Sequence, residues 1–86
     1  MTVNEVKETI RAGNQAARES MTILEQVGAE ADSAAGLARL TIRGSQDRDA
    51  QDGLRILESL GREVELALRR IDAAVDHADA YLKTLG

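Results

Sequence analysis

The 86-residue chain has no Pro, Phe, Trp or Cys and only one Tyr, so it lacks the bulky side chains that usually fill a compact globular core. The absence of Cys excludes a disulfide framework. Eleven basic and fifteen acidic side chains give a net charge of -4, and both signs alternate along the chain, which disfavours binding to a nucleic-acid backbone.

The first half of the chain repeats small and apolar residues every seven positions, which predicts a helix over about residues 2–42. Two rows, three residues apart, define its apolar stripe: Val3, Ile10, Ala17, Leu24, Ala31, Ala38 and Val6, Gly13, Ser20, Val27, Ala34, Thr41. Flanking residues broaden this stripe toward the face of a helix bundle: Ala16, Met21, Ile23, Ala35, Leu37 and Ile42. A break near Gly28, which would split this half into two shorter helices, is the alternative. The absence of Pro and the unbroken repeat favour one continuous helix.

The pattern stops near Ile42, and a turn is expected over about residues 43–46. Gly44 suits the left-handed residue that ends a helix, and Ser45 suits the cap of the next one. Asp47 and Asp49 lie where the positive end of that helix's dipole is expected. The chain should therefore reverse direction tightly at this point.

The second half predicts a helix over about residues 47–85, with a strict alternation of three and four residues between apolar positions. This stripe runs through Ala50, Leu54, Leu57, Gly61, Val64, Leu68, Ile71, Val75, Ala78, Leu82 and Leu85. A second apolar row lies beside it and contains Leu60, Ala67, Ala74 and Tyr81. On the surface, three acid–base pairs are spaced to interact along the helix, Glu58 with Arg62, Glu65 with Arg69 and Asp79 with Lys83, and a solvated face that supports helicity is their favoured interpretation.

These elements predict an all-α fold, a single domain over residues 1–86 that forms a long antiparallel two-helix hairpin. At about 1.5 Å per residue, each helix would be roughly 60 Å long. One partner helix cannot cover both apolar rows, so we expect two hairpins to pair into a four-helix bundle, or one hairpin to dock on another helical protein. The residues expected to form the interaction seam are Leu54, Leu57, Leu60, Val64, Leu68, Ile71, Val75, Tyr81, Leu82, Leu85, Ile10, Leu24 and Val27.

Sites for chemistry are not apparent in the sequence. His77 is the only imidazole, it falls outside the stripe, and no Cys or second His is present to share a metal with it. Neither an activated nucleophile nor a Gly-rich phosphate loop is visible. We therefore expect no enzyme activity, no cofactor, no metal and no small-molecule substrate.

The location of the protein is predicted from two features of the sequence. Acidic residues stand near the N-terminus, where a signal peptide would have basic residues and an apolar run, and no stretch is apolar enough to cross a membrane. We expect a protein that has no membrane span and is either cytoplasmic or exported without a cleavable signal peptide.

Two near-equal helices joined at a central glycine resemble the Trp-Xaa-Gly hairpin family of type VII secretion substrates, the early secreted antigen-like proteins. Gly44 matches the family's glycine in the turn, Ile42 stands in place of its tryptophan, and Tyr81 is followed four residues later by Leu85 rather than an acid. The resemblance implies a small non-enzymatic protein that dimerises as a four-helix bundle. The favoured function is thus a helical protein–protein interaction module, and the alternative is a small type VII-secreted substrate or a carrier or chaperone of a larger effector.

Overall fold

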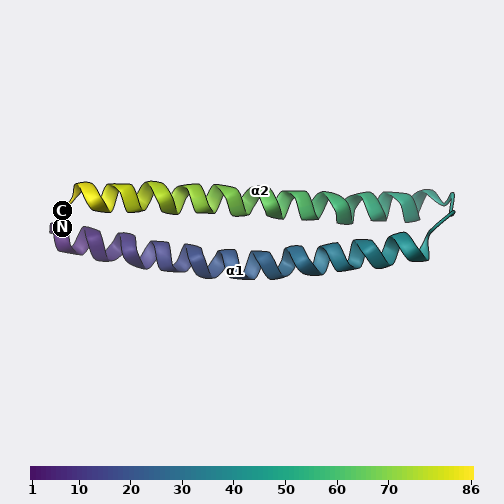
Figure 1. Cartoon of the computed structure of the whole chain (residues 1–86), viewed down its shortest axis with the longest axis horizontal. Coiled ribbons are helices and arrows are strands. Elements are labelled where there is room, and N and C mark those ends of the chain that lie inside the picture. Colours follow the sequence, from purple (N-terminus) through teal and green to yellow (C-terminus); the bar gives the residue numbers. More distant parts are fainter.

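A computed structural model describes all 86 residues as two long helices joined by a short connection (Figure 1). Helix α1 spans Val3–Thr41 and helix α2 spans Arg48–Thr84, and there are no strands. The helices run antiparallel, so the two ends of the chain lie side by side at one tip of the molecule. The molecule measures 62 × 16 × 15 Å, which confirms the predicted helical hairpin and its length. We call the tip with the connection the turn end and the other tip the open end.

Both helices begin at a capping residue. The Thr2 hydroxyl caps α1 by accepting a hydrogen bond from the Glu5 backbone N–H at 3.1 Å, and the same hydroxyl donates to the Glu5 carboxylate. Asp47 caps α2 by accepting from the Ala50 N–H at 3.0 Å. The expected cap, Ser45, instead accepts from the Asp47 N–H, because the connection is two residues longer than predicted.

The connection over residues 42–47 reverses the chain at a residue whose backbone conformation only glycine adopts easily. Gly44 has φ +78°, the left-handed conformation expected from the sequence, and the Ser45 N–H donates to the Ile42 carbonyl at 2.8 Å. The first helix therefore ends one residue earlier, and the second starts one residue later, than the predicted bounds of 42 and 47. Helix α1 is continuous through Gly28, so the alternative of a break there is wrong.

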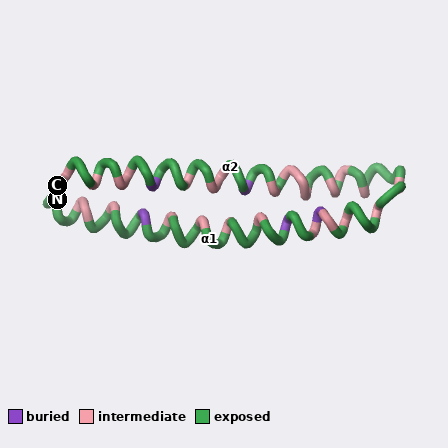
Figure 2. The backbone as a smooth tube through the Cα atoms, viewed as in Figure 1, coloured by how far each residue is buried: buried purple, intermediate pink, exposed green.

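Burial follows the lines where the two helices face each other (Figure 2). On α2, each of the eleven stripe residues from Ala50 to Leu85 is buried or half-buried, as the strict spacing requires. Only four apolar residues are buried, and none of them is larger than valine: Ala31, Ala35, Val64 and Val75. The contact between the two helices is therefore a thin line of side chains rather than a thick core, and we call this contact line the seam.

One row of the predicted α1 stripe is wrong. In the row that contains Val27, Gly13, Ser20 and Thr41 are also exposed. The structure instead buries or half-buries the row four residues after the first: Lys7, Asn14, Met21, Gly28, Ala35 and Ile42. Met21, Ala35 and Ile42 of this row were expected only as flanking residues of the stripe. Its two polar residues each have a partner on the chain: the Lys7 ammonium donates to the Gly86 carbonyl, and Asn14 donates to Asp79.

Candidate interaction surface

The seam sets the register of the two helices. The Cβ of an alanine at Gly28 would lie only 3.2 Å from the Val64 Cγ1, and one at Gly61 would lie 3.0 Å from the Asp32 carboxylate. These two glycines allow the helices to approach closely near the middle of the molecule. Residues 23–41 of α1 consequently lie beside residues 48–69 of α2, and we call this part the turn half and the remainder the open half.

A buried polar contact interrupts the seam in the open half. The Asn14 side chain is only 6% exposed, and its amide nitrogen donates to the Asp79 carboxylate at 2.8 Å. The other oxygen of that carboxylate lies 3.4 Å from the Arg18 guanidinium. Because a buried amide without a partner is costly, this contact favours the one register in which Asn14 and Asp79 meet.

One edge of the hairpin is charged. Two ion pairs cross the seam on this side, Arg18 with Asp79 and Arg39 with Glu58, each at 3.4 Å. Their side chains are between 35% and 56% exposed, so each pair stabilises the fold by about 1 kcal/mol at most. The charged edge consists of the rows that contain these residues: Arg11, Arg18, Glu25, Asp32 and Arg39 on α1, and Glu58, Glu65, Asp72 and Asp79 on α2.

These cross-helix pairs replace the ones expected along α2. Glu58 binds Arg39 rather than Arg62, and Asp79 binds Arg18 rather than Lys83. Both acids stand directly beside the seam, where an arginine of α1 reaches them. The pairing expected from the spacing along α2 was wrong because that spacing takes no account of the arginines on the facing helix.

The opposite edge of the hairpin is nearly uncharged. On each helix one row of residues flanks the seam on either side. The flanking rows that carry the cross-helix ion pairs lie on the charged edge, so the other flanking row of each helix lies on the opposite side. They are Val6, Gly13, Ser20, Val27, Ala34 and Thr41 on α1, and Gly53, Leu60, Ala67, Ala74 and Tyr81 on α2. We call this side the apolar edge. Leu60 remains 39% exposed and Tyr81 52% exposed.

Three larger apolar side chains extend the apolar edge outward, and we count them as part of it. Ile23 and Leu37 lie on α1, and Ile56 lies on α2, each three or four residues from a member of the apolar edge and hence on the same side of its helix. Leu37 is 66% exposed and Ile56 is 69% exposed. The rows of the charged edge contain no large apolar residue. The remaining exposed ones are Met1 and Val3 near the open end and Leu40 and Leu66 on the outer faces of the helices.

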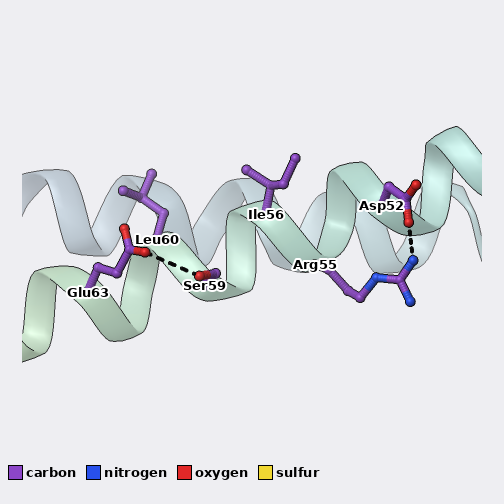
Figure 3. Close-up of a pocket in the computed structure, with 6 residues that line it drawn as sticks. All are labelled: Asp52, Arg55, Ile56, Ser59, Leu60 and Glu63. Carbon is purple, nitrogen blue, oxygen red and sulfur yellow. Dashed lines mark hydrogen bonds and ion pairs between the residues drawn. The ribbon is translucent and has the colours of Figure 1, made fainter.

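An open groove of about 650 Å³ runs along α2 in the turn half (Figure 3). Ile56 and Leu60 project to the same side of the helix, while Arg55 points away from them. The polar residues of the groove are already paired: Arg55 with Asp52, and Ser59 with Glu63 at 3.5 Å. The two aliphatic side chains are thus the part of this groove that has no partner within the chain, and they offer an apolar contact rather than a site for chemistry.

The structure divides the thirteen expected seam residues into two groups. Three of them, Leu60, Tyr81 and Val27, lie on the apolar edge and are exposed. The other ten lie between the helices and are buried or half-buried: Leu54, Leu57, Val64, Leu68, Ile71, Val75, Leu82, Leu85, Ile10 and Leu24. Only the first group is therefore available to a second molecule.

Of the outer members of the exposed group, Ile23 and Leu37 were expected from the sequence as residues that flank the stripe, whereas sequence reasoning missed Ile56. Ile56 does not belong to any apolar row of α2, so a search for rows passes over it. The useful signal is the contrast between the two sides of the seam. Charged residues gather on one side of both helices, and this marks the opposite side as the one where isolated large apolar residues accumulate.

A second groove, of about 440 Å³, opens on the charged edge where Gly28 and Gly61 lack side chains. Glu25, Asp32, Glu58 and Glu65 line it together with Arg62. No group of three or more His, Cys, Asp or Glu side chains is placed to hold a metal ion, and His77 is exposed on α2. Neither helix is long and apolar enough to cross a membrane.

Comparison with known proteins gives no further guide to function. No family model, curated protein or solved structure matches this chain. The arrangement of the surface is thus the basis for a functional assignment.

Proposed function

We propose that this protein is a non-enzymatic helical interaction module that pairs with a second copy of itself to form a four-helix bundle. The observation that carries the proposal is the row of exposed large apolar side chains on one edge, opposite a charged edge. Monomeric proteins rarely expose this many large apolar side chains on one side of the molecule, and such surfaces mark contact sites.

The accessible area of the chain supports the same proposal. The hairpin exposes 6418 Å², whereas a compact monomer of 9.3 kDa exposes about 5,000 Å². The excess of about 1,400 Å² is larger than the roughly 800 Å² that each partner buries in an interface of standard size. A hairpin of this shape therefore has enough uncovered surface to form a stable dimer, and pairing brings its buried fraction toward that of an ordinary domain.

Docking on a different helical protein uses the same surface and is the other form of this proposal. Sedimentation velocity of the purified chain distinguishes them. We expect a species of about twice the 9.3 kDa chain mass at micromolar concentration. A helical monomer at all accessible concentrations would contradict self-association, and co-purification of a stoichiometric helical partner would then identify the heterologous form.

Export by a type VII pathway is a second candidate function. It is favoured by one structural observation, the reversal of two near-equal helices at Gly44 with φ +78°, the position at which the Trp-Xaa-Gly hairpins turn. Detection of the intact chain in culture medium, lost when the secretion machinery is deleted, is the expected result. Equal amounts in the medium with and without that machinery would contradict export by this route.

A further inference from the structure

We infer that two hairpins pack through their apolar edges head to tail, with the turn half of each copy lying over the open half of the other. This inference rests on the proposed self-association and adds the surface and the orientation. Its occupant is a second copy of this chain. Three observations carry it: the area that the pairing must cover, the sizes of the side chains along the apolar edge, and the charges beside them.

The dimensions of the hairpin favour contact along its whole length. A face 62 Å long and 16 Å wide has a footprint of about 1,000 Å² per copy, within the range of specific interfaces. Overlap of the turn halves alone would cover about half of that, less than the roughly 800 Å² that each partner buries in an interface of standard size. Full overlap is possible in two ways, with the turns at the same end or at opposite ends.

Side-chain size distinguishes the two arrangements. On α1 the exposed large residues of the apolar edge, Ile23, Val27 and Leu37, lie in the turn half, whereas Gly13, Ala16 and Ser20 occupy the open half. On α2 the exposed large residues lie in both halves, Ile56 and Leu60 in the turn half and Tyr81 in the open half. If the turns were at the same end, the large residues of both helices would meet at that end, and the two hairpins would be held farther apart there than at the open end. With the turns at opposite ends, Val27 and Leu37 of one copy lie over the small residues of α1 in the other, and Leu60 lies beside Tyr81, so large residues are spread along the contact and the spacing between the hairpins is more even.

Charge favours the same arrangement. In the register set by Gly28 with Val64, Glu30 and Glu63 lie at nearly the same height along the hairpin. With the turns at the same end, Glu30 of one copy would lie near Glu63 of the other, and two acids would repel. With the turns at opposite ends, Glu63 instead lies at the height of His77 on the second copy. Arg70 lies near the two-fold axis in this arrangement, so it meets Arg70 of the second copy. That is one like-charge pair, against the two Glu30–Glu63 pairs that the two-fold symmetry of the other arrangement would create, and the exposed arginines can extend into water at the rim.

The first test asks whether the apolar edge is the interface. Replacing two of its most exposed residues, in the variant Leu37→Glu/Ile56→Glu, should leave the hairpin intact because neither side chain is buried within it. Each substitution should raise the dimer dissociation constant at least about tenfold, since a carboxylate would be buried against apolar groups. The matched control is Leu40→Glu/Leu66→Glu, which changes two exposed leucines on the outer faces of the helices and should leave the dimer mass unchanged.

The outcomes separate this inference from the proposed function. A wild-type dimer that Leu37→Glu/Ile56→Glu alone converts to a helical monomer, judged by sedimentation and circular dichroism, supports both. A dimer that survives this variant overturns the interface but not self-association. A monomeric wild-type chain overturns the proposed self-association itself.

The second test determines the relative orientation of the two copies by cross-linking introduced cysteines. Because the chain has no native cysteine, only the introduced ones can react. Leu60 lies in the turn half of α2 and Tyr81 in its open half. Head-to-tail pairing brings Leu60 of one copy beside Tyr81 of the other. A mixture of the Leu60→Cys and Tyr81→Cys variants should therefore form covalent dimers with a short bismaleimide cross-linker. Cross-linking of Leu60→Cys alone, or of Leu60→Cys only with Ala34→Cys, would overturn the head-to-tail orientation.

Discussion

Asn14 is the one fully buried polar residue, and its contribution to stability can be measured directly. Replacing Asn14 by Ala removes the 2.8 Å hydrogen bond to the Asp79 carboxylate and should lower the free energy of unfolding by about 1 kcal/mol. The loss stays modest because the Asp79 side chain is 41% exposed and regains water. The midpoint of urea unfolding reports the change. Asn4→Ala, at an exposed position of the same helix, is the control, and an equal effect there would contradict a special role for Asn14.

Two glycines of α1 should respond differently to the same substitution. Gly36→Ala places a methyl group in open space and should raise the free energy of unfolding by about 0.5–1 kcal/mol, the usual gain of helix propensity. Gly28→Ala places it 3.2 Å from the Val64 Cγ1, and the stiff, buried valine must move, so the gain should be smaller or absent. Adding Val64→Ala to both variants should remove the difference between them. Equal gains in the wild-type background would show that the helices are not in close contact there.

Among the elements, the start of α2 depends on a single side chain. Asp47→Ala removes the acceptor of the Ala50 N–H and should destabilise the hairpin by about 1 kcal/mol. Asp49 lies two residues further on, in the first turn of α2. Asp49→Ala removes only a favourable charge near the positive end of the helix dipole and should cost a few tenths of a kcal/mol. Thermal unfolding followed by circular dichroism compares the two. The reverse order would place the cap at a different residue.

The helices were predictable from the sequence because several local signals agree. Neither helix contains Pro, the spacing of apolar residues in α2 is unbroken from Ala50 to Leu85, and Gly44 ends the pattern where a left-handed residue is needed. The cap was assigned to Ser45 rather than Asp47 because both residue types favour that position. Which of the two residues caps the helix depends on the length of the connection, and capping propensity does not determine that length.

The faces of the helices were less predictable than their existence. Two rows of α1 border the row of Ile10, and the one richer in apolar residues, with Val27, was chosen. The structure buries the other row, because Asn14 has a partner in Asp79, and that partner is 65 residues away along the chain. Val27 therefore lies on the apolar edge rather than between the two helices of its own hairpin. A polar residue is recognisable as buried only when the side chain that satisfies it is known.

For the whole molecule, self-association should make thermal stability depend on concentration. A hundredfold increase in protein concentration should raise the unfolding midpoint by about 5–10 °C, because the dimer forms only from folded chains. Circular dichroism at two concentrations measures the shift. The Leu37→Glu/Ile56→Glu variant should show none. A midpoint that is constant for the wild-type chain would mean that its fold needs no second copy.

The two chain ends meet at one tip of the rod, and this determines how the molecule bears mechanical load (Figure 1). Tension applied between residues 1 and 86 would unzip the seam from that tip, breaking one layer of side chains at a time, so low force should suffice. Tension applied along the rod, from the turn of one head-to-tail copy to the turn of the other, would instead shear all layers of the contact together. The same pair of hairpins would then be weak when peeled and strong when stretched.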